Sequence, residues 1–188
     1  MKSMVSKSGQ IWVETVLYTL IALAMIAAVM VFAQPRIAEI RDKALIEQSI
    51  GILQDLDNLI LSVQGVTGNQ RAISLGIKAG ILTIDSEEDK FIFEIESKHT
   101  YTEPCDPVQP CTDIMIGNIK VRTEKRGEYN LVTLTRDYSA DYDIEYNERE
   151  ILKALAKSST LYKVVILNKG GEGRIKINIV TEGGGGST

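Results

Sequence analysis

The chain has 188 residues, a formal net charge of −4 and 44% hydrophobic residues. This length suits one domain together with a membrane segment. The mildly acidic balance argues against a nucleic-acid groove, so we expect no nucleic-acid partner.

A short basic leader opens the chain. It contains Lys2 and Lys7, and the pair Gly9-Gln10 follows it. An ordinary secretory signal carries its small residues after the apolar part, next to the cut. Here the small residue comes before the apolar part. A cut between Gly9 and Gln10 would therefore remove residues 1–9 and leave the apolar segment on the mature protein.

The apolar segment follows directly. Residues 16–33 contain no charged side chain, and Glu14 is the only charge within residues 11–33. A spanning helix needs roughly 20 mostly apolar residues, and a buried core helix is usually shorter. The segment is therefore predicted to cross a membrane, and a plain anchor is the simplest role for it.

This arrangement resembles the class III signal peptide of type IV pilin-like proteins, specifically its archaeal form. Gly9, Gln10 and Glu14 match the family's residue before the cut, its first mature residue and its glutamate at mature position five. Trp12 and Tyr18 depart from the Ser and Leu that some archaeal pilins carry at the third and ninth mature positions. The resemblance covers roughly the N-terminal third of the chain.

The resemblance implies a structural role. A prepilin peptidase would cut after Gly9, and the mature chain would join identical subunits in a helical polymer. An assembly ATPase and a membrane platform protein would drive that assembly. Glu14 would set the register between subunits. Apolar residues of the helix would pack in the filament core: Val16, Leu20, Leu23, Ala27 and Met30.

The helical pattern extends over residues 10–64. Pro35 interrupts it, and proline removes a helical hydrogen bond, so we expect a kink or local unwinding there. Beyond Pro35 the pattern is amphipathic, and the helix should end near Gly65 or Gly68. Leucine and isoleucine recur every seven residues at Leu45, Ile52 and Leu59, with Leu56 and Val63 on an adjacent stripe.

Strand signals dominate from about Arg71 onward. We expect strands at residues 80–85, 90–96, 114–123, 129–135, 143–146, 161–168 and 174–181. Residues 147–150 are typical of a helix cap, so a short helix is predicted there, with an irregular segment as the alternative. Its apolar side would be Ile151, Leu152 and Leu155.

Several short strands at regular spacing favour an antiparallel sandwich or barrel. The predicted fold class is α+β, a long N-terminal hydrophobic helix followed by an antiparallel β-sandwich head over residues 65–182. The resemblance to pilins implies that this sandwich is immunoglobulin-like. Residues 183–188 form a Gly-rich tail that is flexible by composition.

The chain has two cysteines, Cys105 and Cys111, in a proline-rich loop. A disulfide between them is predicted, and it would suit an oxidising compartment. Free thiols and a metal site are the alternatives. The spacing is not that of a zinc knuckle and there is no second Cys/His pair, which disfavours a metal.

The location follows from charge. Lys2 and Lys7 precede the span, so the positive-inside rule places the N-terminus in the cytoplasm. The rest of the chain would then lie at the cell surface, as a single-pass membrane protein before assembly and in an extracellular filament afterwards.

Two other classes of function are the alternatives. One is a membrane-tethered, non-polymeric surface protein, or a minor pilin, whose β head binds a ligand. The other is an enzyme, which we do not expect. His99 is the single histidine, and the glycine-rich residues 170–173 join two predicted strands, which is not the context of a phosphate-binding loop. No cofactor is expected. The acidic residues within 85–89 do not have the spacing of a calcium loop, so a solvated turn is favoured.

Overall fold

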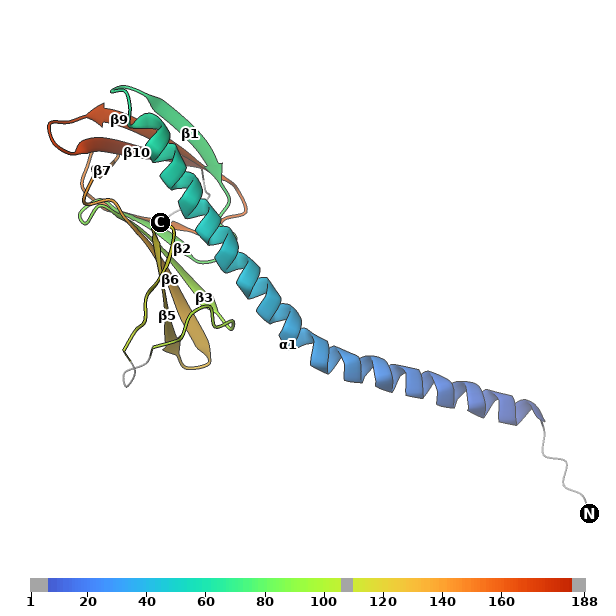
Figure 1. Ribbon diagram of the computed structural model, residues 1–188. Coiled ribbons are helices and arrows are strands. Elements are labelled where there is room, and N and C mark those ends of the chain that lie inside the picture. Colours follow the sequence, from blue (N-terminus) through green and yellow to red (C-terminus); the bar gives the residue numbers. More distant parts are fainter. Residues whose placement is uncertain (1–6, 106–109, 184–188) are drawn as a thin grey trace, which may run out of the picture. The chain divides into compact units, whose positions relative to one another are not determined.

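The computed structural model describes residues 7–105 and 110–183, and the backbone alone for residues 7–11 and 35. The predicted leader residues 1–6 and most of the predicted tail lie outside the described residues. The chain divides into two compact units, residues 1–40 and residues 41–188, which we call the N-terminal and C-terminal units. One long helix and ten strands make up the described residues (Figure 1).

Helix α1 covers Lys7–Val63. It is continuous across Pro35, so the local unwinding expected there is absent. It ends within two residues of the predicted Gly65, and the Gln64 amide still donates to the carbonyl of Ile60 at 3.1 Å. The first strands follow soon afterwards, because the glycine-rich segment between them cannot extend the helix.

In the C-terminal unit, α1 buries one face. Its buried apolar residues are Ile46, Ile50, Ile52, Leu53, Leu56, Ile60 and Val63. These positions follow a three- and four-residue spacing, which places them on one side of a helix. Leu45 and Leu59 of the predicted heptad are only half-buried, so the centre of the buried face lies beside the predicted stripe.

The ten strands have these bounds: β1 Gln70–Leu75, β2 Ile81–Asp85, β3 Lys90–Ser97, β4 Ile114–Ile116, β5 Ile119–Arg126, β6 Tyr129–Asp137, β7 Tyr142–Tyr146, β8 Leu152–Ala156, β9 Tyr162–Gly170 and β10 Ile175–Gly183. They form a four-stranded sheet of order β1-β9-β10-β7 and a six-stranded sheet of order β4-β5-β6-β3-β2-β8. All pairs are antiparallel except β10 with β7. The predicted α+β class, a long apolar helix before a mostly antiparallel β region, is confirmed.

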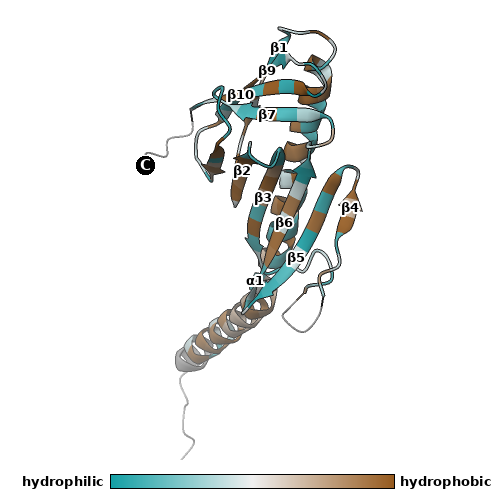
Figure 2. Ribbon diagram, turned by 90° about the vertical axis from the view of Figure 1, so that its left-hand side faces the viewer, coloured by the Kyte–Doolittle hydropathy of each residue, from teal (hydrophilic) through white to brown (hydrophobic). Residues whose placement is uncertain are grey.

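Strand alternation builds the core of the C-terminal unit. Phe91, Phe93 and Ile95 of β3 are buried on one face, in the strand predicted over residues 90–96. Figure 2 shows apolar and polar residues alternating along the strands. Both sheets and the second half of α1 contribute to one apolar cluster. The helix is therefore part of the core of this unit.

The predicted helix after residue 147 is wrong. Asn147 and Glu148 adopt left-handed φ angles of 51° and 62°, which cannot start a helix. The residues that follow form β8, which pairs with β2 in an antiparallel register. Leu155 is buried in that sheet, whereas Leu152 is 57% exposed. Pairing with a distant strand has overridden the local helical signal.

The predicted single strand over residues 114–123 is two strands. It folds back at Gly117, which has a φ of 59°, a conformation that favours glycine. Strands β4 and β5 therefore pair with each other, with Ile116 opposite Ile119.

Candidate membrane-spanning and assembly segment

The N-terminal unit is a helix whose side chains are uncovered. Every described side chain from Trp12 to Gln34 is exposed, apart from the half-buried Ala33. Among the described residues, α1 alone is long and apolar enough to cross a membrane, and its most apolar stretch has no buried residue. A contiguous apolar surface of this extent needs lipid or another protein surface around it.

The five predicted filament-core residues lie on one side of the helix. Their spacing of three and four residues aligns them along a single face. Val16 is 37% exposed, whereas Leu20, Leu23 and Met30 are 56–62% exposed, and Ala27 is exposed as well. The chain itself covers none of these side chains, so their face is open to a partner.

The predicted processing and register residues lie at the start of α1. The backbone of Gly9 and Gln10 is helical, but the side chain of Gln10 is not described. Glu14 is described and exposed. Its Oε1 accepts a hydrogen bond from the hydroxyl of Tyr18 at 3.2 Å, one helical turn away. The Thr19 hydroxyl donates to the carbonyl of Val16 at 2.8 Å.

Charged residues follow the uncharged segment directly. Arg36 pairs with Glu39 at 3.3 Å on the exposed surface. Exposed pairs of this kind contribute at most about 1 kcal/mol, so they mark a water-facing segment rather than stabilise it strongly. Two large apolar side chains lie among these charges, Ile37 at 63% exposure and Ile40 at 70%.

The predicted disulfide is confirmed, with an S–S distance of 2.05 Å between Cys105 and Cys111. Because the chain's two thiols are joined, the free-thiol and thiolate-metal alternatives do not apply to this state. Cys105 also pairs with β5, since its amide donates to the Thr123 carbonyl and its carbonyl accepts from the Lys125 amide, both at 2.9 Å. These backbone hydrogen bonds fix Cys105 to the edge of β5, and the disulfide ties Cys111 to it. Closing so small a loop stabilises by about 2 kcal/mol on the chain-entropy account.

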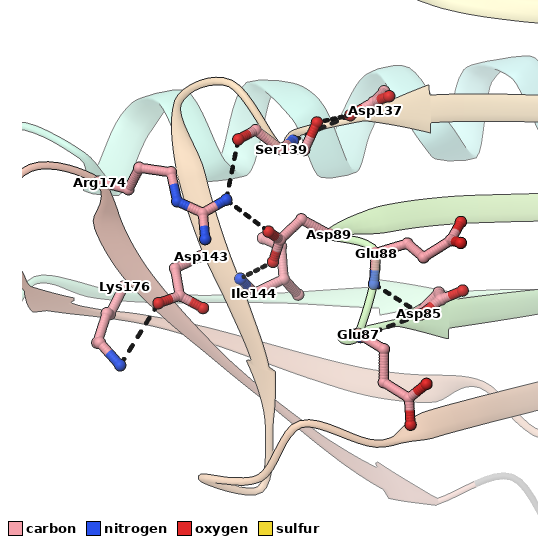
Figure 3. Close-up of polar contacts among 10 residues, drawn as sticks. All are labelled: Asp85, Glu87, Glu88, Asp89, Asp137, Ser139, Asp143, Ile144, Arg174 and Lys176. Atoms are coloured by element: carbon pink, nitrogen blue, oxygen red, sulfur yellow. Dashed lines mark hydrogen bonds and ion pairs between the residues drawn. The ribbon is translucent and has the colours of Figure 1, made fainter.

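The acidic turn after β2 proves to be a structural link. Asp85 is buried and accepts hydrogen bonds from the amides of Glu87 and Glu88, both at 3.1 Å (Figure 3). Asp89 is also buried, at 6% exposure, with a left-handed φ of 53°. The predicted solvated turn is therefore right for Glu87 and Glu88, which are exposed, and wrong for the two aspartates.

Asp89 connects the two sheets. One carboxylate oxygen accepts from the amide of Ile144 in β7 at 2.7 Å, and the other accepts from Arg174 at 2.7 Å (Figure 3). Arg174 also donates to the carbonyl of Ser139 at 2.9 Å. Protein donors thus bind both oxygens of Asp89, so this carboxylate links the turn before β3 in one sheet to β7 in the other.

Charge pairs on the outer faces of the sheets shift the pKa values of two carboxyl groups. Arg122 donates two hydrogen bonds to Asp113, at 2.7 and 2.9 Å, and holds the pKa of that carboxyl below its ordinary value. Burial opposes the ionisation of Glu145, but hydrogen bonds from Lys169 and Lys176 outweigh it and lower the pKa. The outer faces of the sheets therefore carry ionised side chains, as expected for surfaces in contact with water.

A surface hollow lies beside β2 and β3. It has a volume of about 490 Å³ and is lined by Glu94 and Glu96, by Arg126 and Lys157, and by less polar residues around them. Charges of both signs therefore surround it. Because acidic and basic side chains both line the hollow, its charge does not indicate a class of ligand.

No family model, no curated protein and no solved structure matches the chain. The assignment of function therefore rests on the residues and contacts described above.

Sequence reasoning missed two polar contacts that matter here. One is the bond from Tyr18 to Glu14, for which the four-residue spacing of the two residues is a signal in the sequence. The buried side chain of Asn168, which bonds to the end of α1, carried no local signal.

Proposed function

We propose that this chain is a structural subunit of an extracellular type IV pilus-like filament. Its N-terminal helix holds it in the membrane before assembly, and helix packing then polymerises it. One observation carries the proposal: the exposed apolar surface of α1 from residue 12 to residue 34 surrounds the helix and contains a single carboxylate, Glu14, near its start.

The same surface suits two environments. Lipid can solvate it before assembly, and helices of neighbouring copies can cover it afterwards, so moving from one to the other need not expose it to water. Alanines along the segment allow helices to approach closely, as in membrane bundles. Glu14 is costly in either environment unless it finds a partner, which suits a residue that sets register.

Apolar residues beyond the span favour a polymer over a plain tether. Residues 11–33 already extend about 35 Å as a helix, against a hydrocarbon thickness of about 30 Å. Ile37 and Ile40 lie further on, among charged residues, and are 63% and 70% exposed. In a tethered monomer they would face headgroups or water. In a filament, neighbouring helices would cover them.

The remaining parts of the proposal follow from the resemblance. A prepilin peptidase removes residues 1–9, and an assembly ATPase and a platform protein add the subunit to the filament. The N-terminus begins in the cytoplasm and the C-terminal unit lies outside the cell, where a disulfide persists. We also propose an immunoglobulin-like sandwich for the β part, supported by two mostly antiparallel sheets that share one core.

A second candidate is a membrane-tethered surface protein, or a minor pilin, whose β head binds a ligand. The hollow between Glu94 and Lys157 is the observation that favours it. Abundance separates the two, because a major subunit dominates the protein sheared from a cell surface and a tethered protein stays with the membrane.

The proposal is tested by the intact mass and N-terminal residue of the protein in filaments sheared from native cells. We expect an abundant chain that begins at Gln10. The control is Gly9→Val, which should block the cut and leave the full-length chain in the membrane fraction. An abundant sheared chain that still carries its leader would refute the processing step, and a chain confined to membranes would refute the filament.

A further inference from the structure

Glu14 lies far from any cation that its own helix could offer on the C-terminal side. Residues 15–35 contain no lysine, arginine or histidine, and Arg36 is the next cation. The separation of 22 residues between Glu14 and Arg36 corresponds to about 33 Å along a helix. A carboxylate within an apolar segment is costly without a hydrogen-bond donor. On that side, only an uncharged donor of the same helix can reduce this cost.

Tyr18 supplies such a donor. Its hydroxyl donates to Oε1 of Glu14 at 3.2 Å. The geometry follows from helical spacing, because residues four apart lie on the same face and a long side chain points back toward the N-terminus. The hydroxyl of Thr19 is engaged elsewhere, since it donates to the carbonyl of Val16.

We propose that Tyr18 is a positioning residue for Glu14. Its hydroxyl donates a hydrogen bond to the Glu14 carboxylate of the same helix, and this bond fixes the position of the carboxylate both in lipid and in the assembled polymer. This inference rests on the proposed function, because it requires that α1 enter a membrane and then a filament. Tyr18 is 62% exposed and combines an apolar ring with a polar tip, a combination suited to the edge of a bilayer.

The contact has a consequence for assembly. A carboxylate accepts several hydrogen bonds, so a bond from Tyr18 leaves capacity for a donor from a neighbouring copy. It also restricts the rotamers of Glu14 before that copy arrives. Less side-chain freedom is then lost on assembly, which favours one register over others.

A direct test measures the contact in the full-length chain. The protein is labelled with ¹³C at the carboxyl carbon of Glu and at the hydroxyl-bearing carbon of Tyr, and solid-state NMR is recorded in bilayers and in sheared filaments. We expect a short-range cross-peak between these two carbons, assigned by its loss in both Glu14→Gln and Tyr18→Phe. Absence of that cross-peak from a chain shown to span the bilayer would overturn the inference and leave the proposed function standing.

A matched pair of variants tests the role of the donor. Tyr18→Phe keeps the ring and loses the hydroxyl, whereas Tyr18→Gln loses the ring and keeps a donor at the same spacing. We expect Tyr18→Phe to lower filament yield about threefold, an effect of the size that one hydrogen bond typically has in a membrane bundle, and Tyr18→Gln to restore most of that loss. Tyr129→Phe, in the C-terminal unit, is the control and should be neutral. Equal yields for wild type and Tyr18→Phe, or an equal deficit for Tyr18→Gln, would refute a role for the donor.

Discussion

The pair formed by Asp57 and Arg136 joins the helix of the C-terminal unit to β6. Arg136 donates to Asp57 at 2.8 Å, and their side chains are only 14% and 16% exposed. The guanidinium also lies over the ring of Tyr138, 4.3 Å from its centroid. A cation held in this way depends on its carboxylate, because little water can replace it.

We expect Asp57→Asn to lower the free energy of unfolding by about 1–3 kcal/mol, since the partly buried guanidinium loses its charged partner. The measurement is urea unfolding of the full chain in detergent micelles, followed by the near-ultraviolet circular dichroism of tyrosine. Six of the seven tyrosines lie in the C-terminal unit, whereas the single tryptophan, Trp12, reports on the apolar segment.

The matched control for that measurement is Asp55→Asn on the exposed side of the same helix. It should change stability by no more than about 0.5 kcal/mol. If both variants unfold at the wild-type urea concentration, the Asp57–Arg136 pair does not hold the helix.

Among whole elements, the C-terminal end of α1 shows how a distant strand completes a helix. The last carbonyls of a helix have no partner within it. The side-chain amide of Asn168 in β9 donates to the carbonyls of Val63 and Gln64, both at 3.0 Å, and its oxygen accepts from the Gly170 amide at 2.7 Å. Asn168 is 2% exposed, so water cannot take over these bonds.

We expect Asn168→Ala to destabilise the C-terminal unit by about 2–4 kcal/mol, because it leaves buried backbone groups without partners. Amide hydrogen exchange should also rise selectively in the last turn of α1. Asn58→Ala, at an exposed helical position, is the control and should be nearly neutral. Unchanged exchange at residues 60–64 in Asn168→Ala would show that another group caps the helix.

These elements show what a sequence can reveal. The length of α1 and the buried face of β3 follow from local apolar spacing, so both were predictable. The segment that became β8 was not, since its apolar residues fit a helix as well as an edge strand, and only pairing with β2 decides between them. Asp57 and Arg136 are 79 residues apart, and no local pattern reports a contact across that distance.

Most of what the structure shows of the candidate site could be predicted from local sequence patterns. The apolar segment and the Gly9, Gln10 and Glu14 pattern lie in one stretch of sequence, which is why they stood out. The bond between Glu14 and Tyr18 was also within reach, because it spans one helical turn. What surrounds the segment in a polymer depends on other copies, and the sequence of one chain does not encode that arrangement in any local pattern.

For the C-terminal unit as a whole, charges favour the folded state near neutral pH. A hydrogen bond from Ser139 lowers the pKa of Asp137, and hydrogen bonds from Arg122 lower the pKa of Asp113. Hydrogen bonds from Lys169 and Lys176 lower the pKa of Glu145. All three values lie below those of the unfolded chain, near 4. Their stabilisation is therefore complete above about pH 5 and is lost as the pH falls through the folded-state values.

We accordingly expect the urea midpoint of the full chain in micelles to stay level between about pH 5 and pH 9 and to fall on both sides. On the acid side, Asp113→Asn should reduce the midpoint at pH 7 but converge with wild type once the pH falls below the lowered folded-state pKa of Asp113, where the wild-type carboxyl is also protonated. A constant difference between the two proteins across that range would show that the Asp113–Arg122 pair contributes through packing rather than through charge.

The alkaline side of the same profile has a different origin. Tyr138 is 1% exposed, and burial raises its pKa, aided by the charge of Asp57 and opposed by that of Arg136. Its raised folded-state pKa means that stabilisation is present below the unfolded value near 10 and is lost as the pH rises above it. Tyr138→Phe should therefore flatten the alkaline fall and leave the acid fall unchanged. Should the alkaline fall persist undiminished in that variant, lysines such as Lys90, whose pKa is raised by a hydrogen bond to Glu88, would account for it instead.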